Sequence, residues 1–306
     1  MAAPSLSSER RRAAWLFLTP MLVVLAVVAA WPLARTLYFS LTNATLVDMS
    51  SHRFVGLSNY LAYDGGRWYG VLSDPQWLTA LGNTMVFVVV SVTLETILGV
   101  LIALLLNLRF PGRSLMRAAM LVPWAIPTVV SAKMWSWMLN DQFGVVNDAL
   151  LKLGIIAEPV AWLAEPSLSM ASVIVVDVWK TTPFIALLVL AALQMLPKDC
   201  YEAAEVDGVG AVKTFFHVTL PLIAPALAVA IIFRVLDAMR MFDLVYVMTG
   251  ATDATMTLSV FAQRELVSFQ DVGYGSAAAT LVFFIIALLT SLYLMAMRLD
   301  LDGRAR

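Results

Sequence analysis

Six long apolar segments, separated by shorter polar ones, dominate the pattern along this chain. They cover approximately residues 13–41, 84–106, 119–139, 169–196, 222–239 and 276–297. A helix that crosses about 30 Å of hydrocarbon needs roughly 20 apolar residues. The segments are apolar nearly all round, as expected of helices buried in lipid or protein. The pattern therefore predicts an all-α polytopic membrane protein with six transmembrane helices.

Two prolines, Pro123 and Pro127, fall within the third segment. Proline removes a backbone donor and clashes with the preceding turn, so it kinks or breaks a helix. Membranes tolerate such breaks because neighbouring helices can satisfy the freed carbonyls. The third span is therefore predicted to be bent or broken.

Composition agrees with a membrane protein and excludes several other classes. Of 306 residues, 61% are hydrophobic and 13% are charged, whereas soluble domains carry about 25% charged residues. The net charge of −1 indicates no nucleic-acid partner. The single cysteine, Cys200, excludes an internal disulfide, and His52 with His217 are too few and too far apart to nominate a metal site.

The distribution of basic residues predicts the orientation of the chain. The run that begins at 13 is too long for a signal-peptide core, so we expect a retained first transmembrane helix. The N-tail, the loops at 107–118 and 197–221 and the C-tail would lie on one side of the membrane. They hold Arg10, Arg11, Arg12, Arg109, Arg113, Arg117, Lys198, Lys213, Arg298, Arg304 and Arg306. The loops on the other side hold Arg53, Arg67, Lys152, Arg240 and Arg264. The positive-inside rule then places both termini in the cytoplasm. The expected organisation is a cytoplasmic N-tail over 1–12, a transmembrane domain over 13–297 with a cytoplasmic loop at 197–221, and a C-tail over 298–306.

The polar loop at 197–221 has the pattern of a helix–turn–helix. Asp199 and Glu202 have the spacing of a capping box, which predicts a short helix to about Val206. Gly208 and Gly210 are predicted to permit a turn that a residue with a Cβ would resist, before a second helical turn over 212–216. An ordinary surface loop with an acidic face is the alternative. The nearby stretch 208–214 lacks the spacing of a phosphate-binding loop, so energy from ATP would have to come from another subunit.

The same loop resembles the EAA loop of ABC-importer permeases. That pattern is E-A-A, three residues, G, nine residues, an aliphatic residue, one residue and L-P, and Val218 holds the aliphatic position usually taken by isoleucine. In the family this loop docks a separate ATPase. The resemblance implies that the coupling residues are Glu202, Ala203, Ala204, Asp207, Gly208, Leu220 and Pro221.

The resemblance extends over most of the chain. The stretches 54–57 with Asn59-Tyr60, Asn83-Thr84 at the opening of the second core helix, and 242–250 are similar to elements of sugar-importer permeases, although Ala251 stands where a second glycine often follows. The chain is identified as a member of the carbohydrate branch of type I ABC importers, and resembles the sugar-site-bearing permease of the maltose and trehalose type. This implies a bacterial inner-membrane location, a second homologous permease, two ATPase subunits that hold ATP and Mg, and an extracytoplasmic sugar-binding protein. No cofactor is expected on this chain.

Ionisable residues within the apolar segments are candidates for function because burying them in a membrane is costly. They include Glu95, Lys133, Asp177, Lys180, Arg234 and Asp237. Asp177 with Lys180, and Arg234 with Asp237, are each three residues apart and share a helix face. Each pair could neutralise itself, or the four could line a polar cavity between the fourth and fifth helices. For Glu95, a structural pairing and a pore role are both open.

The resemblance also implies a set of sugar contacts. By position these are Trp124, Thr128, Asp177, Lys180, Thr181, Phe184, Arg234, Ala238 and Met241, with Asp237 as an additional polar candidate. Ala238 and Met241 replace polar residues of the maltose type, which favours a different sugar.

Three alternatives belong to other classes. A permease for glycerol phosphate would use Lys180 and Arg234 to bind an anion. An ion-coupled secondary transporter usually has more spans and inverted repeats and would leave the EAA pattern unexplained. A membrane transferase needs a convergent acid–base or metal cluster, whereas the acidic residues here are scattered.

Overall fold

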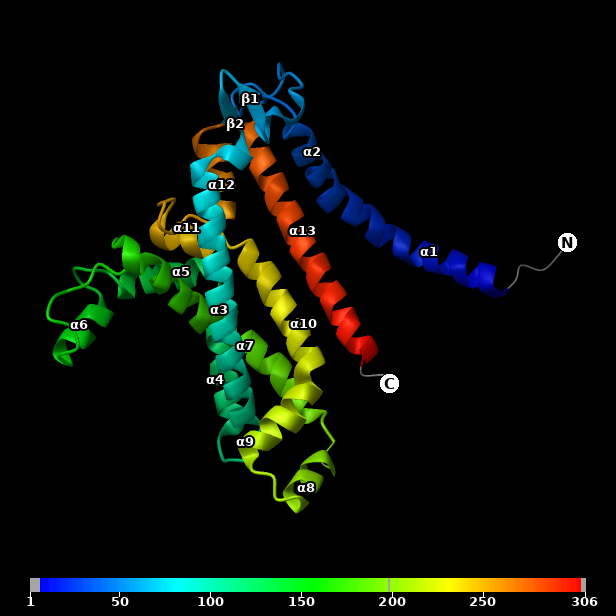
Figure 1. The fold of residues 1–306 in the computed structure, drawn as a ribbon, viewed down its shortest axis with the longest axis vertical. Coiled ribbons are helices and arrows are strands. Elements are labelled where there is room, and N and C mark those ends of the chain that lie inside the picture. The colour runs from blue at the N-terminus through cyan, green and yellow to red at the C-terminus, as the bar shows by residue number, and fades with distance from the viewer. Residues whose placement is uncertain (1–5, 198, 304–306) are drawn as a thin grey trace. The chain divides into compact units, whose positions relative to one another are not determined.

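Long apolar helices form most of the protein, described here from a computed structural model that covers residues 6–197 and 199–303 (Figure 1). Within that part of the chain, five helices are long and apolar enough to cross a membrane, or six if one bent pair forms a single span. The elements, with η for a 3₁₀- or π-helix, are α1 (Leu6–Leu25), η1 (Ala26–Ala30), α2 (Trp31–Phe39), η2 (Gly56–Asn59), β1 (Ala62–Asp64), β2 (Arg67–Tyr69), η3 (Val71–Ser73), α3 (Pro75–Asn107), α4 (Arg113–Ala125), α5 (Thr128–Met138), α6 (Val145–Lys152), α7 (Pro166–Gln194), α8 (Asp199–Val206), α9 (Ala211–Thr214), η4 (Phe215–Thr219), α10 (Leu220–Met239), α11 (Asp243–Thr249), α12 (Leu258–Gln263), η5 (Arg264–Ser268) and α13 (Val272–Gly303).

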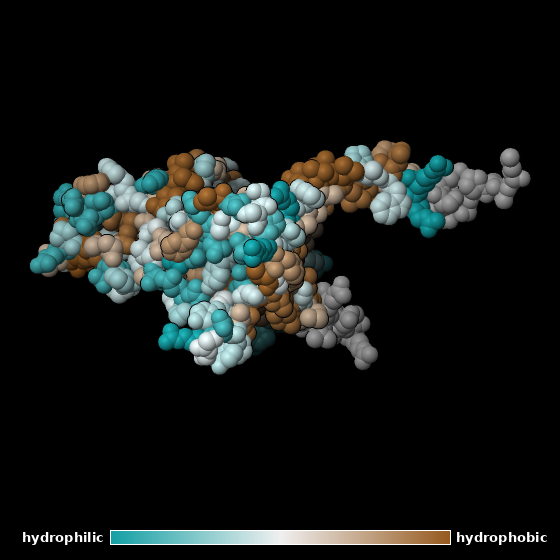
Figure 2. Space-filling view, turned by 90° about the horizontal axis from the view of Figure 1, so that it is seen from above, coloured by the Kyte–Doolittle hydropathy of each residue, from teal (hydrophilic) through white to brown (hydrophobic). Residues whose placement is uncertain are grey.

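The first apolar segment forms a helix from Arg10 to Phe39, made of α1, η1 and α2. None of its most apolar stretch is buried by protein, and Figure 2 shows the surface of this helix as largely brown, the colour of hydrophobic residues. Exposed side chains such as Phe17 and Val28 have no protein neighbours to cover them. Such a surface requires lipid or another subunit around it.

The second span begins at Pro75, earlier than the apolar pattern indicates. Proline suits the first turn of a helix because the N–H there has no intrahelical partner. Asn83, predicted to open this helix, therefore lies inside it. The Asn83 amide donates hydrogen bonds to the carbonyls of Asp253 (2.8 Å) and Met256 (3.1 Å). The motif residue thus fastens the loop after α11 instead of starting a helix.

The third span is broken, as its two prolines predict. α4 and α5 meet at 93°. Ile126 and Pro127 between them have extended ψ angles of 131° and 140°, because the residue before a proline is held out of the helical region. Pro123 lies within α4 without ending it. The break is therefore set at Pro127.

α3 and α7 pack closely, and this contact sets the level at which their polar residues meet. A Cβ added to Gly99 would lie 2.7 Å from Ile185 Cγ2, so only glycine fits there. The buried side chains around this contact are Val100, Ala103, Leu106, Ile185, Val189, Leu190, Leu193 and Ile223. Glu95 lies one helical turn before Gly99 on α3, and Thr181 lies one turn before Ile185 on α7. The close contact of Gly99 with Ile185 therefore places Glu95 opposite Thr181.

The chain divides into two compact units, residues up to 74 with 262–281, and 75–261 with residues from 282 onward. The first unit contains an antiparallel hairpin of β1 and β2, which corrects the expectation of an all-α chain. Gly65 and Gly66 at its tip have φ of +56° and +84°, and tight hairpin turns need such positive angles. The second unit contains all of the candidate site described below.

Candidate functional site

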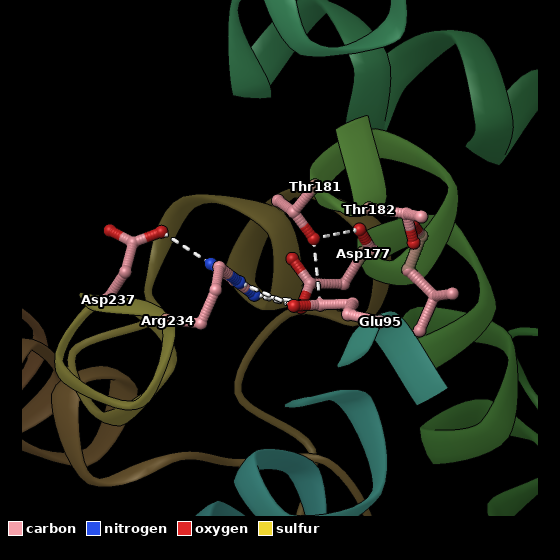
Figure 3. A network of polar contacts seen from close by, with 7 residues as sticks. Glu95, Asp177, Thr181, Thr182, Arg234 and Asp237 are labelled. Atoms are coloured by element: carbon pink, nitrogen blue, oxygen red, sulfur yellow. Dashed lines mark hydrogen bonds and ion pairs between the residues drawn. The ribbon is translucent and has the colours of Figure 1, made fainter. Parts of the chain in front are cut away.

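A buried guanidinium, that of Arg234 on α10, joins three helices through carboxylates (Figure 3). Its Nε and Nη2 donate to the two oxygens of Glu95 on α3, at 2.5 and 2.9 Å. Nη2 also donates to Asp177 on α7 at 3.0 Å, and Nη1 donates to Asp237, one turn along α10, at 2.7 Å. The exposed fractions of Glu95, Asp177 and Arg234 are 0%, 0% and 3%, so these groups contact each other rather than solvent.

Thr181 completes the network from α7. Its hydroxyl lies 2.7 Å from Glu95 Oε1 and 2.6 Å from the carbonyl of Asp177. Asp177 Oδ1 is buried and has no hydrogen-bond partner within the described residues. An unsatisfied buried acceptor is costly. This oxygen is therefore the place in the network where an added hydroxyl donor would be most favourable.

Two guanidinium groups meet the carboxylates of this network. Glu95, Asp177 and Asp237 all contact Arg234, and Asp237 also pairs with Arg240 at 3.5 Å. Removing one partner of a buried ion pair typically costs about 3–5 kcal/mol because it leaves an uncompensated charge. The network therefore links α3, α7 and α10, and only Asp237 among its carboxylates is half-exposed, at 51%.

Lys180 does not form the expected pair with Asp177. Its Nζ donates to the carbonyl of Ile126 at 3.0 Å, at the break between α4 and α5. A broken helix leaves carbonyls without their usual N–H partners, and an ammonium group satisfies one of them. The pairing predicted from i,i+3 spacing is wrong for this residue, whereas the Arg234–Asp237 pair is present.

Trp124 and Phe184, the aromatic residues among the predicted sugar contacts, lie side by side near this break. Trp124, which is 49% exposed, stacks on Phe184 with ring centroids 6.4 Å apart and planes at 24°. Trp179 packs edge-on against Trp135 at 5.4 Å. The exposed Trp124 face is therefore available to a ligand, while Trp179 is engaged within the protein.

The other predicted contacts are half-buried or buried. Thr128 is the first residue of α5 and is half-buried. Met241 is half-buried, and its carbonyl accepts a hydrogen bond from Thr257 at 2.8 Å. Ala238 is fully buried. Asp177 and Arg234 likewise pack in the protein instead of facing an open cavity, because each is the other's ion-pair partner.

Glu95 belongs to this network but not to the set of sugar contacts that the resemblance implies. Neither its sequence neighbours nor the family pattern identifies it as part of the site. The available signal is its position as an acid in the middle of the second apolar segment, which demands a buried cation nearby. The structure supplies Arg234 as that cation, which supports the structural pairing over an open pore role.

The segment after α7 forms the helix–turn–helix expected from its pattern. α8 begins at Asp199, Gly208 adopts a φ of +67°, and α9 begins at Ala211. Gly210 has a φ of −66° and open space around its Cβ position, so the expectation that it needs to be glycine is wrong. After Thr214 the chain continues as a π-helix into α10, which extends the predicted second turn.

Most of the predicted coupling residues are accessible. Glu202, Ala203, Asp207 and Gly208 are exposed, Leu220 and Pro221 at the start of α10 are half-buried, and Ala204 is buried. The Tyr201 hydroxyl lies 3.1 Å from Thr219 Oγ1, which ties α8 to the base of α10. α8 thus presents an acidic and small-residue face while remaining attached to the helix that carries Arg234.

Comparison with known proteins identifies relatives along nearly the whole chain. Residues 95–301 match the family described as "Binding-protein-dependent transport system inner membrane component". The chain is 41% identical to the trehalose/maltose transport system permease protein MalF of Thermococcus litoralis, over 94% of each protein. It is 36% identical to the sulfoquinovosyl glycerol transport system permease protein SmoG of Agrobacterium fabrum, over 94% of this chain and 91% of the relative.

A solved structure has the same fold. It is that of a bacterial alginate ABC transporter in complex with an alginate pentasaccharide-bound periplasmic protein. The TM-score is 0.78 at 20% identity, with 95% of this chain and 96% of the other covered. At this identity the likeness concerns the arrangement of the helices alone.

Proposed function

Because the chain belongs to the family of binding-protein-dependent transport system inner membrane components, we propose that it is the membrane-spanning permease subunit of an ATP-driven sugar importer. Its relatives include permeases named for trehalose, maltose and a sulfoquinovosyl glycerol. The observation that carries the proposal is the buried network of Arg234, Glu95 and Asp177 across three apolar helices. Ionisable groups within a span are costly and are by default candidates for function. Chemistry on ATP belongs to separate subunits.

The proposed topology has six spans with both termini in the cytoplasm of a bacterial inner membrane. It counts α4 and α5 as one broken span, which their combined length and apolarity support. The basic residues of the loops at 107–118 and 197–221 support the orientation. In this arrangement α8 faces the cytoplasm.

The proposed partners are a second homologous permease, two ATPase subunits that bind ATP and Mg, and an extracytoplasmic sugar-binding protein. The related alginate transporter was solved with a periplasmic protein, which supports the last of these. The exposed Glu202, Ala203 and Asp207 on and after α8 support the ATPase contact. Movement of α8 would reach α10 through Tyr201 and Thr219, which are in hydrogen-bond contact.

The proposed sugar site lies where α10 and α7 meet the break between α4 and α5. Trp124 offers an aromatic face to a sugar ring, and Asp177 Oδ1 offers a free acceptor to a hydroxyl. In the described state the charged groups satisfy each other, so binding would require them to exchange partners. Alternating access provides that step, since a ligand stabilises whichever state it contacts better.

A neutral disaccharide of the trehalose or maltose type is the favoured substrate. Three carboxylates around Arg234 make the cluster a poor site for a second anion, because like charges repel strongly in a low-dielectric interior. Glycerol phosphate is therefore the weaker alternative. The relative named for a sulfoquinovosyl glycerol keeps an anionic sugar as a second candidate, with Lys180 as its counter-ion.

The decisive experiment reconstitutes the chain with its partner permease, ATPases and binding protein in lipid vesicles. We expect trehalose or maltose to stimulate ATP hydrolysis above the basal rate, and glycerol phosphate to leave it unchanged. Stimulation by glycerol phosphate alone would refute the sugar assignment. Active transport by the purified chain without any ATPase would refute the importer itself in favour of a secondary transporter or a membrane enzyme.

A further inference from the structure

A basic cavity of about 480 Å³ lies between the loop that joins α3 to α4 and the C-terminal end of α7. Three arginines, Arg109, Arg113 and Arg117, contribute to its lining. Leu193 and Leu196 provide apolar wall, and Tyr201 contributes from α8. The cavity lies in the second compact unit, apart from the Arg234 network and from the proposed sugar contacts.

Within the described part of the chain, no acidic side chain balances the positive charge of this cavity. No aspartate or glutamate lines it, and the ion pairs found among the described residues involve none of the three arginines. Arg117 donates to the carbonyl of Leu106 at 2.8 Å through Nη2, while its Nε is buried without a hydrogen-bond partner in the described chain. Three like charges around one cavity repel each other, so an anion there would be strongly favourable.

We propose that this cavity binds a phosphate group, supplied by the headgroup of an anionic phospholipid. Guanidinium groups match phosphate oxygens with paired N–H donors. α3 ends at Asn107 and α7 ends at Gln194, so the cavity lies at the ends of two candidate spans, at the level of lipid headgroups. Basic pockets between helices at this level are suited to anionic lipids, and Leu193 with Leu196 suits the lipid's apolar part. Free inorganic phosphate carries the same chemistry and is the other possible source.

The bound phosphate would also contact the segment predicted to couple to the ATPase. Tyr201 lines the cavity from α8, and its hydroxyl lies 3.1 Å from Thr219 Oγ1. Occupancy would therefore restrain the position of α8 relative to the end of α7. The inference needs only that the chain is a membrane protein, and stands or falls independently of which solute is imported.

The test compares lipid retention by purified importer complexes that carry different forms of this chain. Native mass spectrometry measures phosphatidylglycerol and phosphatidylcholine retained after extraction from vesicles of equal content. The variant is R109Q/R113Q/R117Q, and the matched control is R10Q/R11Q/R12Q, which removes the same charge from exposed residues that do not line the cavity. The double variant R109Q/R113Q keeps the Arg117 hydrogen bond to Leu106 in case the triple variant fails to assemble.

We expect the unaltered and control complexes to retain phosphatidylglycerol over phosphatidylcholine, and the cavity variants to lose most of it. Displacement of the lipid by added inorganic phosphate would support the phosphate site and identify free phosphate as a competing source. Equal loss in the control would attribute retention to bulk charge, and undiminished retention in the cavity variants would place the lipid elsewhere. Either result would overturn the proposal, as would density for an acidic segment of the ATPase in the cavity.

Discussion

Arg234 of α10 and Glu95 of α3 form a two-point ion pair, with Nε and Nη2 at 2.5 and 2.9 Å from the carboxylate oxygens. The two residues are 139 positions apart in the chain, and both are buried among apolar helices. This pair connects the second and fifth apolar segments at one level of the helix bundle. Because it is buried and bidentate, it is strong enough to hold two helices in register.

The first prediction concerns the stability that this pair provides. Glu95→Gln keeps the shape of the side chain but removes its charge, so Arg234 loses its principal partner. Asp177 and Asp237 still balance the charge of Arg234, so the cost is that of weakened buried hydrogen bonds, about 1–3 kcal/mol, seen as a lower thermal transition of the purified complex. Asp237→Asn is the matched control, because Asp237 contacts the same guanidinium but is 51% exposed, and exposed pairs contribute at most about 1 kcal/mol. Equal effects of the two changes would contradict a structural role for Glu95.

The second prediction concerns transport. Asp177→Ala removes the free acceptor Oδ1 and one partner of Arg234, and Arg234→Ala removes the guanidinium. We expect both to abolish sugar uptake in vesicles while basal ATP hydrolysis persists, since neither residue lies on α8. Asp148→Asn is the control, because that carboxylate pairs with Lys152 at an exposed position. Normal uptake by Asp177→Ala would remove this residue from the sugar pathway.

A third prediction separates the two glycines of the helix–turn–helix in the loop at 197–221. Gly208 has a φ of +67°, where a residue with a Cβ costs about 1–2 kcal/mol. Gly208→Ala should therefore distort α8 and weaken binding of the ATPase, measured by co-purification and by sugar-stimulated ATP hydrolysis. Gly210→Ala should have no effect, because its φ is −66° and no atom lies near its Cβ position. A defect in Gly210→Ala that equals the one in Gly208→Ala would show that backbone conformation is not the cause.

The fourth prediction concerns the aromatic face beside the helix break. Trp124→Ala removes a stacking surface that we expect to contribute about 1 kcal/mol, equivalent to roughly a fivefold change in affinity. The sugar concentration that gives half-maximal uptake should rise by that factor, with basal ATP hydrolysis unchanged. Trp137→Ala provides the comparison, since Trp137 is also exposed and packs against Phe143. If both variants lower uptake equally, general packing explains the loss and Trp124 has no special role.

The apolar helices and the helix–turn–helix at 197–221 could be predicted because neighbouring residues in the chain determine their conformation. A span needs only enough consecutive apolar residues to cross the hydrocarbon, and Pro127 breaks its helix through its own ring and missing N–H. The turn after α8 follows from the freedom of Gly208. The hairpin at 62–69 also forms between neighbouring residues, and the Gly65-Gly66 pair at its tip is typical of a hairpin turn. The sequence pattern of apolar helices did not predict this hairpin.

Sequence by itself therefore determined the class of protein, the apolar helices, the break at Pro127 and the turn at Gly208. Tertiary structure alone decided which charges meet. Spacing along the helix predicted that Asp177 pairs with Lys180. Instead, Asp177 pairs with Arg234 from another helix. Lys180 donates a hydrogen bond to the carbonyl of Ile126. The reason is physical: a charge within an apolar bundle must find its partner wherever packing brings one within reach, and that partner need not lie on its own helix.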